Sequence, residues 1–401
     1  MTQLQPPRSV GILQVTSLAL IAAVMVANIY YSQPLLFLLS QDFNQPISQV
    51  GIVITLTQLG YGASVLLIVP LGDVLDRRKL ASLMLAVCAV SLAATASATS
   101  FIQFCVMQLL VGMSASATMV IIPYIATYSP EEKRGAYVGK IITGVLLGVL
   151  LARTVSGSVA HFTSWRTIYV GAAALVTFML IVIRKIMSPE PPKLGANYLA
   201  LISSVLKLAL INRVVRQRSF YAMLGMGSFS AFWTALTLLL SAPPYNLDSS
   251  KIGLFGLIGV GGALSASIAG RLSDKGNAKS LATVLALALT GSWLLMLGPA
   301  PSILQLIIGV AVLDISAMGL QVVHQSVLYK SQIGAQSRVT SAFITSSFIG
   351  MSAGSAAVNY AFSKLGWYGA CLIGGSLPVI LLIHAFMFRS SPQSQARSEI
   401  N

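Results

Sequence analysis

The amino-acid sequence predicts an all-α membrane protein with twelve transmembrane helices in two pseudo-symmetric six-helix bundles. Hydrophobic residues make up 56% of the 401-residue chain and charged residues only 9%, which is too little charge to cover a water-facing surface. Apolar runs of roughly 20 residues, enough to cross about 30 Å of hydrocarbon, recur along the whole chain. Basic residues concentrate in alternate connections between these runs.

The apolar runs define the spans and the domains. We place the spans, in chain order, at about 12–38, 48–71, 80–99, 101–127, 137–160, 166–187, 220–242, 252–270, 279–298, 302–328, 340–361 and 367–388. The first run is too long for the apolar core of a signal peptide, so we interpret it as a membrane helix. One long connection divides the chain. The predicted parts are an N-terminal bundle at 1–187, a cytoplasmic central loop at 188–219, and a C-terminal bundle with a short cytoplasmic tail at 220–401.

Basic residues predict the orientation. If both termini are cytoplasmic, all but four of the 25 Lys and Arg residues fall on the cytoplasmic side. Arg166, Lys251 and Lys364 remain outside, and Arg153 lies within a helix. The net charge of +15 therefore follows from membrane topology, and we expect no nucleic-acid partner.

Enzymatic and metal chemistry have no sequence support. Cys88, Cys105 and Cys371 lie in apolar stretches and form no CxxC, so neither a disulfide framework nor a metal site is expected. The chain has no HExxH, GxSxG or phosphate-binding glycine loop. We predict no enzyme activity and no cofactor, with transport driven by an ion gradient or by the substrate's own gradient.

The two halves resemble each other at a shift near 200 residues. Gly72-Asp73-Val74-Leu75-Asp76-Arg77 follows the second span, and Gly270-Arg271-Leu272-Ser273-Asp274-Lys275 follows the eighth. Arg134 corresponds to Arg338, and Trp165 to Trp367. A duplicated six-helix unit is the architecture of one large class of secondary transporters.

On these residues the whole chain resembles the major facilitator superfamily. The loop from Gly72 to Lys79 keeps the glycine, the acid and the basic cluster of the family pattern G-x-x-x-D-[RK]-x-G-[RK]-[RK], but lacks its x-G pair. The segment from Gly270 to Gly276 is its second-half copy. The resemblance implies the major facilitator fold and a gating role for these loops. Gly72 would permit close helix approach. Asp73 or Asp76 would pair with basic residues or face a helix N-terminus of the opposite half. The predicted gating residues are Gly72, Asp73, Asp76, Arg77, Arg78, Gly270 and Asp274.

Two further stretches are similar to the drug:proton antiporter and sugar efflux permease branch. The fourth span keeps the spacing of R-x-x-x-G as Gln108 to Gly112, with glutamine in place of the arginine. The fifth span has glycines at Gly144, Gly148 and Gly157 with Arg153 among them. We expect these glycines to pack this helix tightly against a neighbour.

Ionisable residues inside the bilayer are costly, by at least ~2.5–3.5 kcal/mol on insertion scales, and so indicate function. The coupling candidates are Asp314, Arg153 and His324. A carboxyl group in an apolar surrounding binds its proton more tightly, which suits Asp314 to proton coupling. The alternatives are structural: Arg153 could satisfy backbone carbonyls or fix packing between the halves, Asp314 could make a hydrogen bond, for instance to Arg153, and His324 could serve packing alone.

Uncharged polar and aromatic residues within the spans are candidates for the substrate cavity. In this family that cavity is lined by helices one, four, seven and ten. They are Asn28, Tyr31, Gln58, Tyr61, Gln108, Phe229, Trp233, Gln321 and Asn359, with Tyr30 as a further member of the first helix. Aromatic residues near helix ends could instead anchor the protein at the membrane interface.

Three functional hypotheses follow. The first is a monomeric, proton-coupled exporter of a small amphipathic molecule or sugar, working by alternating access in a bacterial inner membrane. The second is an importer or uniporter of a sugar or other nutrient on the same fold. The third is a membrane receptor or scaffold that moves nothing, against which the short loops argue. The expected partners are the lipid bilayer, a small-molecule substrate and protons.

Overall fold

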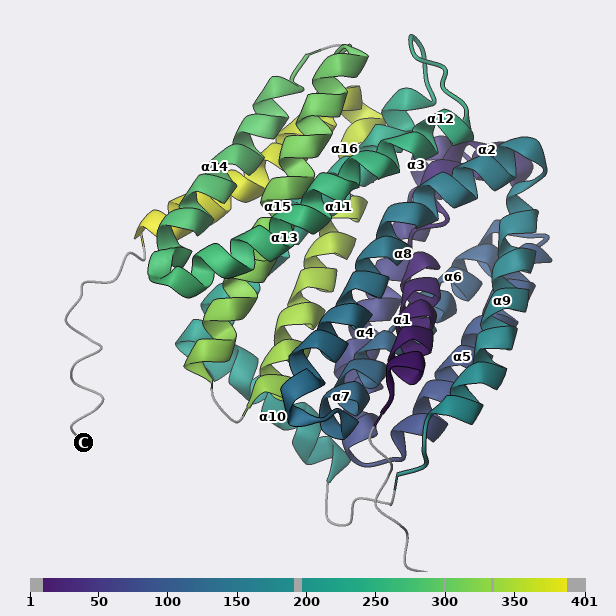
Figure 1. Ribbon diagram of the computed structural model, residues 1–401. Coiled ribbons are helices and arrows are strands. Elements are labelled where there is room, and N and C mark those ends of the chain that lie inside the picture. The colour runs from purple at the N-terminus through teal and green to yellow at the C-terminus, as the bar shows by residue number, and fades with distance from the viewer. Residues whose placement is uncertain (1–9, 191–196, 299, 333–334, 388–401) are drawn as a thin grey trace, which may run out of the picture.

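The computed structural model describes residues 10–190, 197–298, 300–332 and 335–387, and every element in these ranges is helical. Arg8, Lys193, Arg389 and Arg397, which the orientation prediction places in the cytoplasm, lie outside the described residues. Two large hydrophobic cores form, one from the N-terminal half and one from the C-terminal half. Figure 1 shows the two halves side by side, as the prediction of two bundles requires.

Twelve spans are accounted for within the described ranges. Nine helices there are long and apolar enough to cross a membrane. The predicted first and eighth spans are broken into shorter helices, and the predicted last two form one assigned helix, α16 (Gln336–Met387), which is kinked at Gly366 with φ 58°. Glycine tolerates that positive φ without the Cβ clash of other residues, so the chain turns there between two spans.

The breaks in the first and eighth spans have local causes. The first span consists of α1 (Ile12–Ala27), η1 (Gln33–Leu35) and α2 (Leu36–Asp42). Pro34 lies in the first turn of η1 and supplies no backbone N–H, so the helical hydrogen bonding cannot run through. The eighth span consists of α12 (Ser249–Leu254), η4 (Phe255–Gly259) and α13 (Val260–Leu272), in a glycine-rich stretch. Asp248 caps α12 by accepting a hydrogen bond from the Lys251 backbone N–H. This hydrogen bond is the main reason that the pKa of Asp248 lies below its ordinary value.

Continuous helices make up most of the other spans, and polar caps begin several of them. Asp76, Ser100 and Ser164 accept backbone N–H bonds at the starts of α5, α6 and α9. The remaining elements of the N-terminal half are α3 (Ile47–Val50), α4 (Ile52–Leu67), η2 (Val69–Asp73), α5 (Arg77–Ala96), α6 (Phe101–Ala115), α7 (Thr118–Tyr128), η3 (Glu131–Lys133), α8 (Arg134–Phe162) and α9 (Trp165–Ile186).

The central connection contains a helix of its own. Asn197 caps α10 (Tyr198–Ile211), and Asn212 then caps α11 (Arg213–Leu240). The seventh span therefore begins ahead of residue 220, inside the stretch predicted as a loop. The C-terminal half is completed by η5 (Ser273–Asn277), α14 (Ala278–Leu295) and α15 (Ile303–Ser331).

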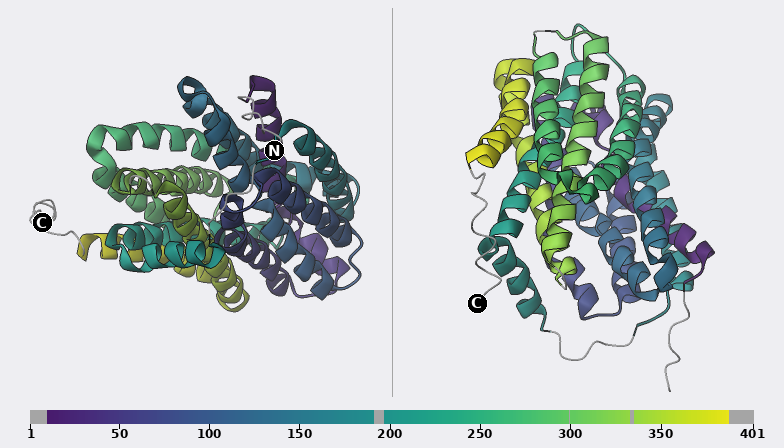
Figure 2. Two further views of the ribbon diagram at one scale, coloured as in Figure 1. Left: turned by 90° about the horizontal axis from the view of Figure 1, so that it is seen from below. Right: turned by 60° about the vertical axis from the view of Figure 1, so that its left-hand side comes forward.

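The two faces of the molecule differ in how the halves meet. We call the face with the start of α1 and with α10 the terminal face, and the other, with α2, α3 and α12, the opposite face (Figures 1 and 2). Toward the opposite face, α8 meets α12 and α4 meets α16 at close range. A Cβ added at Gly157 would lie 2.2 Å from the Ser249 carbonyl oxygen, and Thr154 donates a 3.0 Å hydrogen bond to the Gly253 carbonyl oxygen.

The other glycines of the fifth span pack within the N-terminal half. A Cβ at Gly144 or Gly148 would lie 2.3 or 2.2 Å from the carbonyl oxygens of Ala19 and Ala23 on α1. The predicted tight packing of this helix is thereby confirmed, and it involves two neighbours: α1 toward the terminal face and α12 toward the opposite face.

Candidate functional site

A chain of three side chains joins the two halves in the middle of the spans. The Arg153 guanidinium on α8 lies over the Trp233 ring of α11, with 4.0 Å between its central carbon and the ring centroid. The Trp233 indole N–H donates a 3.1 Å hydrogen bond to Asp314 Oδ1 on α15. Arg153 and Asp314 are 3% and 4% exposed. Both ionisable groups are therefore buried at depths where water cannot solvate them.

Residues around the first helix break complete the surroundings of Arg153. Its Nε donates a 2.5 Å hydrogen bond to Gln33 Oε1, and the Tyr30 ring lies 4.7 Å from the guanidinium carbon. Tyr30 and Trp233 thus both offer aromatic faces to the cation, an arrangement worth about 2 kcal/mol or more in a desolvated place.

Arg153 and Asp314 form no direct ion pair. Among the described residues, the ion pairs with N and O atoms within 4.0 Å do not include Arg153, and its Nη2 has no hydrogen-bond partner. The hydrogen bond considered between them is replaced by Trp233, which interacts with both. A buried guanidinium N–H without an acceptor is energetically unfavourable, which marks this atom as an unusual feature of the buried chain.

Glycines of the eighth span make room for both charged side chains. A Cβ at Gly256 would lie 3.0 Å from Arg153 Cβ, and one at Gly259 would lie 2.9 Å from Asp314 Oδ2. A Cβ at Gly262 would lie 3.1 Å from the Asp314 carbonyl oxygen. The three glycines are spaced at i, i+3 and i+6, so they fall along one side of the helical segment and allow α15 and α8 to approach it.

Several predicted cavity residues lie where the halves touch. Gln58 and Ser230 exchange two hydrogen bonds of 2.8 and 3.0 Å between α4 and α11. The Tyr61 ring stacks on Phe348 of α16 with a centroid distance of 4.1 Å. A Cβ at Gly51 would lie 2.0 Å from Asn359 Oδ1, which places the Asn359 amide tightly against the first turns of the second span.

The remaining predicted cavity residues interact inside their own half. Asn28 donates to the Val24 carbonyl oxygen, Gln108 accepts from Thr57, and Gln321 donates to Ser347. Phe229 lies beside Trp233 with a ring-centroid distance of 6.3 Å, and Tyr31 is buried. The structure therefore brings Trp233, and Phe229 next to it, to the central chain.

His324 belongs to a different cluster from Asp314. It lies ten residues after Asp314 on α15, which is about 15 Å along the helix axis at 1.5 Å per residue. Its Nδ1 is 3.3 Å from Arg218 Nη1.

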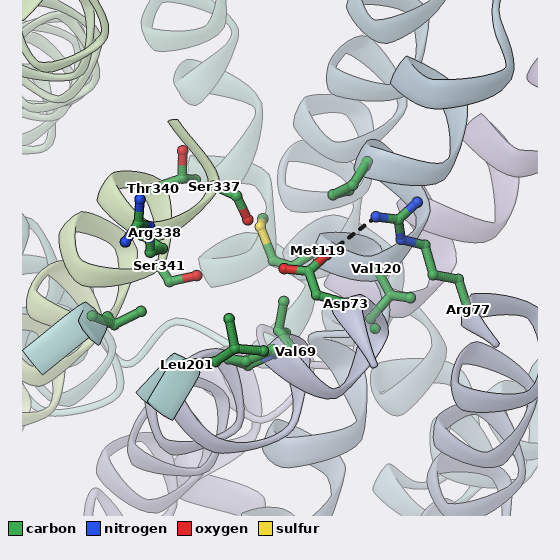
Figure 3. A pocket seen from close by; sticks show the side chains of 14 residues that line it. Val69, Asp73, Arg77, Met119, Val120, Leu201, Ser337, Arg338, Thr340 and Ser341 are labelled. Carbon is green, nitrogen blue, oxygen red and sulfur yellow. Dashed lines mark hydrogen bonds and ion pairs between the residues drawn. The ribbon is translucent and has the colours of Figure 1, made fainter. Parts of the chain in front are cut away.

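On the terminal face a cleft separates the halves. It is a cavity of about 110 Å³ between η2, α7, α10 and the start of α16. Figure 3 shows Asp73 and Arg77 on one wall and Ser337, Arg338, Thr340 and Ser341 on the other.

The predicted gating residues interact within the N-terminal half rather than across the cleft. Arg77 pairs with Asp73 at 3.2 Å and with Glu190 at 3.3 Å. Asp76 caps its own helix by accepting the Arg78 N–H, and the Arg78 guanidinium donates to the Arg184 carbonyl oxygen. The expected partner of Asp73 or Asp76 in the opposite half is therefore absent from this arrangement of the described residues.

The glycines of the two gating loops are not tightly packed. A Cβ at either Gly72 or Gly270 would meet its nearest neighbours at 3.6 Å, an ordinary contact. The close approach expected at Gly72 is not seen in this arrangement of the halves, and the gating role of Gly72 stays a prediction. The side chain of Asp274 lies outside the described part of the chain.

Three contributors were missed by the sequence reasoning: Gln33, Ser230 and Glu190. Gln33 directly precedes Pro34 inside an apolar run. A proline there indicates that the helix is broken, which leaves backbone and side-chain polar groups near the break to find other partners. Ser230 lies between Phe229 and Trp233 on the same helix and has no signal beyond its polarity. Glu190 follows the sixth span directly, and its burial could not be foreseen from that position.

Comparisons with known proteins agree with this architecture. The family model of the Major Facilitator Superfamily matches residues 18–355. An uncharacterized transporter, YgaY of Escherichia coli O157:H7, is 36% identical over 366 residues, covering 91% of this chain and 93% of its own. A probable transporter of Streptomyces coelicolor is 32% identical, covering 90% of this chain and 84% of its own.

A solved structure has the same fold. The human organic anion transporter MFSD10 matches with a TM-score of 0.71 at 15% identity, covering 95% of this chain and all of that one. The family model and the sequence relatives identify a multi-pass membrane transporter. The protein belongs to the major facilitator superfamily, with bacterial transporters among its relatives.

Proposed function

We propose that this protein is a proton-coupled secondary transporter that exports a small amphipathic molecule or sugar by alternating access, without changing it chemically. The observation that carries the proposal is the buried chain Arg153–Trp233–Asp314, in which a cation of one half is connected to a carboxylate of the other. A mid-membrane carboxylate that shares a network with the moving interface couples its protonation to the relative position of the halves.

Asp314 is the proposed proton carrier. Of the buried acidic side chains described, Asp76 and Glu190 flank spans at the terminal face, while Asp314 lies inside one. Proton binding removes its negative charge and weakens the charge-assisted bond from Trp233. The ring that supports Arg153 is then less constrained, so the contact between α8 and α11 becomes easier to rearrange.

Arg153 and its aromatic neighbours are the proposed substrate contacts. The unpartnered Nη2 can donate to a hydroxyl or carbonyl oxygen of the substrate. Tyr30 and Trp233 supply flat faces on which a sugar ring or the apolar part of an amphipathic molecule can stack. The site therefore suits a molecule with one polar edge and one apolar face.

The arrangement of the faces supports alternating access. Close contacts join the halves toward the opposite face, and the cleft lies on the terminal face. In the alternate state the α8–α12 contact separates and the cleft closes, which brings the Asp73 carboxylate toward the first turn of α16. That N-terminal turn, which begins at Gln336, carries the positive end of the helix dipole and unpaired N–H groups.

The excess of basic residues supports a cytoplasmic terminal face in a bacterial inner membrane. The exposed Lys79, Arg184, Lys185 and Arg216 all lie at that end of their helices. The cleft on the terminal face then opens to the cytoplasm. An exporter takes up its substrate from that side.

Proteoliposomes test the proposal. A thermal-shift screen of the purified protein against sugars, amino acids and amphipathic drugs first finds a ligand. Its movement is then followed with a proton gradient imposed in either direction, and with the gradient removed by an ionophore. We expect accumulation against the ligand's own gradient only when protons flow the other way. Movement at the same rate with the ionophore present would contradict proton coupling, and accumulation along the proton flow would contradict export.

A further inference from the structure

A second cavity lies at the outer edge of the N-terminal half, on the terminal face. Its volume is about 350 Å³. It lies where α5 begins and α9 ends, and these two helices pack side by side (Figure 1). This cavity is separate from the cleft between the halves, and it takes no part in the mechanism proposed above.

Three basic side chains line this cavity. Arg78 and Lys79 come from the first turn of α5, and Arg184 comes from the last turn of α9. Arg78 Nη2 donates to the Arg184 backbone carbonyl oxygen, which holds the two helix ends together. The ion pairs found among the described residues include none of the three. Their positive charges are therefore not neutralised by a partner in the described part of the chain.

The acids beside the cavity are already engaged. Asp76 lines the cavity, and its carboxylate accepts the Arg78 backbone N–H at 2.8 Å as the cap of α5. Glu190 is buried and pairs with Arg77 at 3.3 Å. Three cations and one capping carboxylate leave the described lining with a net charge of +2, so the cavity attracts an anion.

The rest of the lining is small or apolar. Ser82 and Ala86 lie one turn apart on α5, and their small side chains leave the space between the helices. Leu83 also lines the cavity and is 62% exposed. Val87 and Val90 follow it at i+4 and i+7 and are exposed as well. On a spanning helix such exposed apolar residues face lipid, so the basic end of the cavity passes into a lipid-facing surface.

We propose that this cavity binds the headgroup of an anionic phospholipid, with the phosphate among Arg78, Lys79 and Arg184 and an acyl chain along the exposed apolar side of α5. Guanidinium and ammonium groups are strong partners of phosphate oxygens. Basic pockets between spanning helices bind lipid headgroups of this kind. Inorganic phosphate offers the same oxygens, but it makes no use of the apolar wall, so the structure favours the lipid.

Native mass spectrometry of the full chain in a non-ionic detergent tests this site. The protein is titrated with phosphatidylglycerol and, separately, with phosphatidylcholine that has the same acyl chains but no net charge. We expect the first phosphatidylglycerol to bind about tenfold more tightly or better. A further arm adds inorganic phosphate at constant ionic strength, and we expect it to displace the lipid only at millimolar concentrations or above.

Matched variants assign the binding to this cavity. Lys79→Gln and Arg184→Gln each remove one exposed positive charge, and each should weaken binding of the first phosphatidylglycerol by about fivefold. Lys79→Arg keeps the charge and should retain binding. The control is Lys279→Gln. Lys279 is exposed near the start of α14, the third span of the other half, and does not line the cavity. This control should bind phosphatidylglycerol as the wild type does.

Three results would overturn the proposal. Equal affinity for the two lipids would mean that the cavity does not read the headgroup charge. Equal weakening by Lys279→Gln and by Lys79→Gln would mean a general attraction of the basic face. Saturable binding of inorganic phosphate without a preference for phosphatidylglycerol would make the site one for a soluble anion. None of these results bears on proton-coupled transport, which the ionophore experiment tests separately.

Discussion

The Trp233 indole donates its N–H to Asp314 at 3.1 Å while its ring face lies 4.0 Å from the Arg153 guanidinium carbon. One neutral side chain thus stands between a buried cation and a buried carboxylate. A direct buried ion pair would gain more Coulomb energy but would also be harder to separate. With the ring in between, the link from Arg153 to the other half at this point is a stacking contact and not an ion pair.

Replacing Asp314 with Asn tests the proton carrier. Asn keeps the size of the side chain and an oxygen for the Trp233 N–H, but it cannot exchange a proton. We expect net transport driven by a proton gradient to fall to the level of protein-free liposomes, while exchange of substrate across the membrane persists. Asp42→Asn, which removes an exposed acid paired with Arg166, is the control. Gradient-driven transport at the wild-type rate would make Asp314 a structural residue.

Trp233→Phe tests the link between the two charged groups. The change removes the hydrogen bond to Asp314 and weakens the cation–π contact, so we expect the initial rate of proton-driven transport to fall by about tenfold. Trp293→Phe is the matched control, because Trp293 is another buried tryptophan whose N–H serves Ser228 instead. Equal losses in the two variants would show that bundle packing, not the link, is responsible.

Gly157→Ala tests the contact that joins the halves at the opposite face. The added methyl would overlap the Ser249 carbonyl oxygen, so α8 and α12 must separate. We expect the population to shift toward a state open at the opposite face, seen as a longer distance between spin labels at residues 162 and 254 in a variant without its native cysteines. Gly139→Ala, on the same helix with nothing within 4 Å, should leave the distance unchanged.

Glu190→Ala tests the buried ion pair next to the cleft. The side chains of Arg77 and Glu190 are 9% and 2% exposed, and removal of one partner from such a pair costs about 3–5 kcal/mol. Asp73 still pairs with Arg77, so we expect the lower end of that range. The readout is a lower thermal unfolding midpoint in detergent, compared with Glu132→Ala at an exposed position. An unchanged midpoint would mean that Glu190 adds nothing to stability.

The fold could be predicted because lipid leaves few alternatives. Backbone polar groups must be satisfied internally in hydrocarbon, so each long apolar run has to become a helix. The internal likeness of the halves, such as Trp165 with Trp367, then gives the two-bundle architecture. The breaks were not foreseen, because Pro34 and the glycines of the eighth span interrupt helices that remain apolar throughout.

The site was predictable only in part. Arg153 and Asp314 stand out because a charge inside a span is rare, and the structure places both in one chain. Their relation depends on Trp233, whose side chain could equally have packed into the core. Gln58 and Ser230 touch across the halves because of how far α4 and α11 are shifted and rotated relative to each other. Sequence spacing on separate helices does not carry that information.

The Gly157–Ser249 and Gly253–Thr154 contacts have a mechanical consequence. At these two contacts the surfaces meet through backbone atoms and small hydroxyls, so no bulky side chain locks one helix to the other there. A seam of this kind suits the separation of the two helices that the proposed alternating access requires.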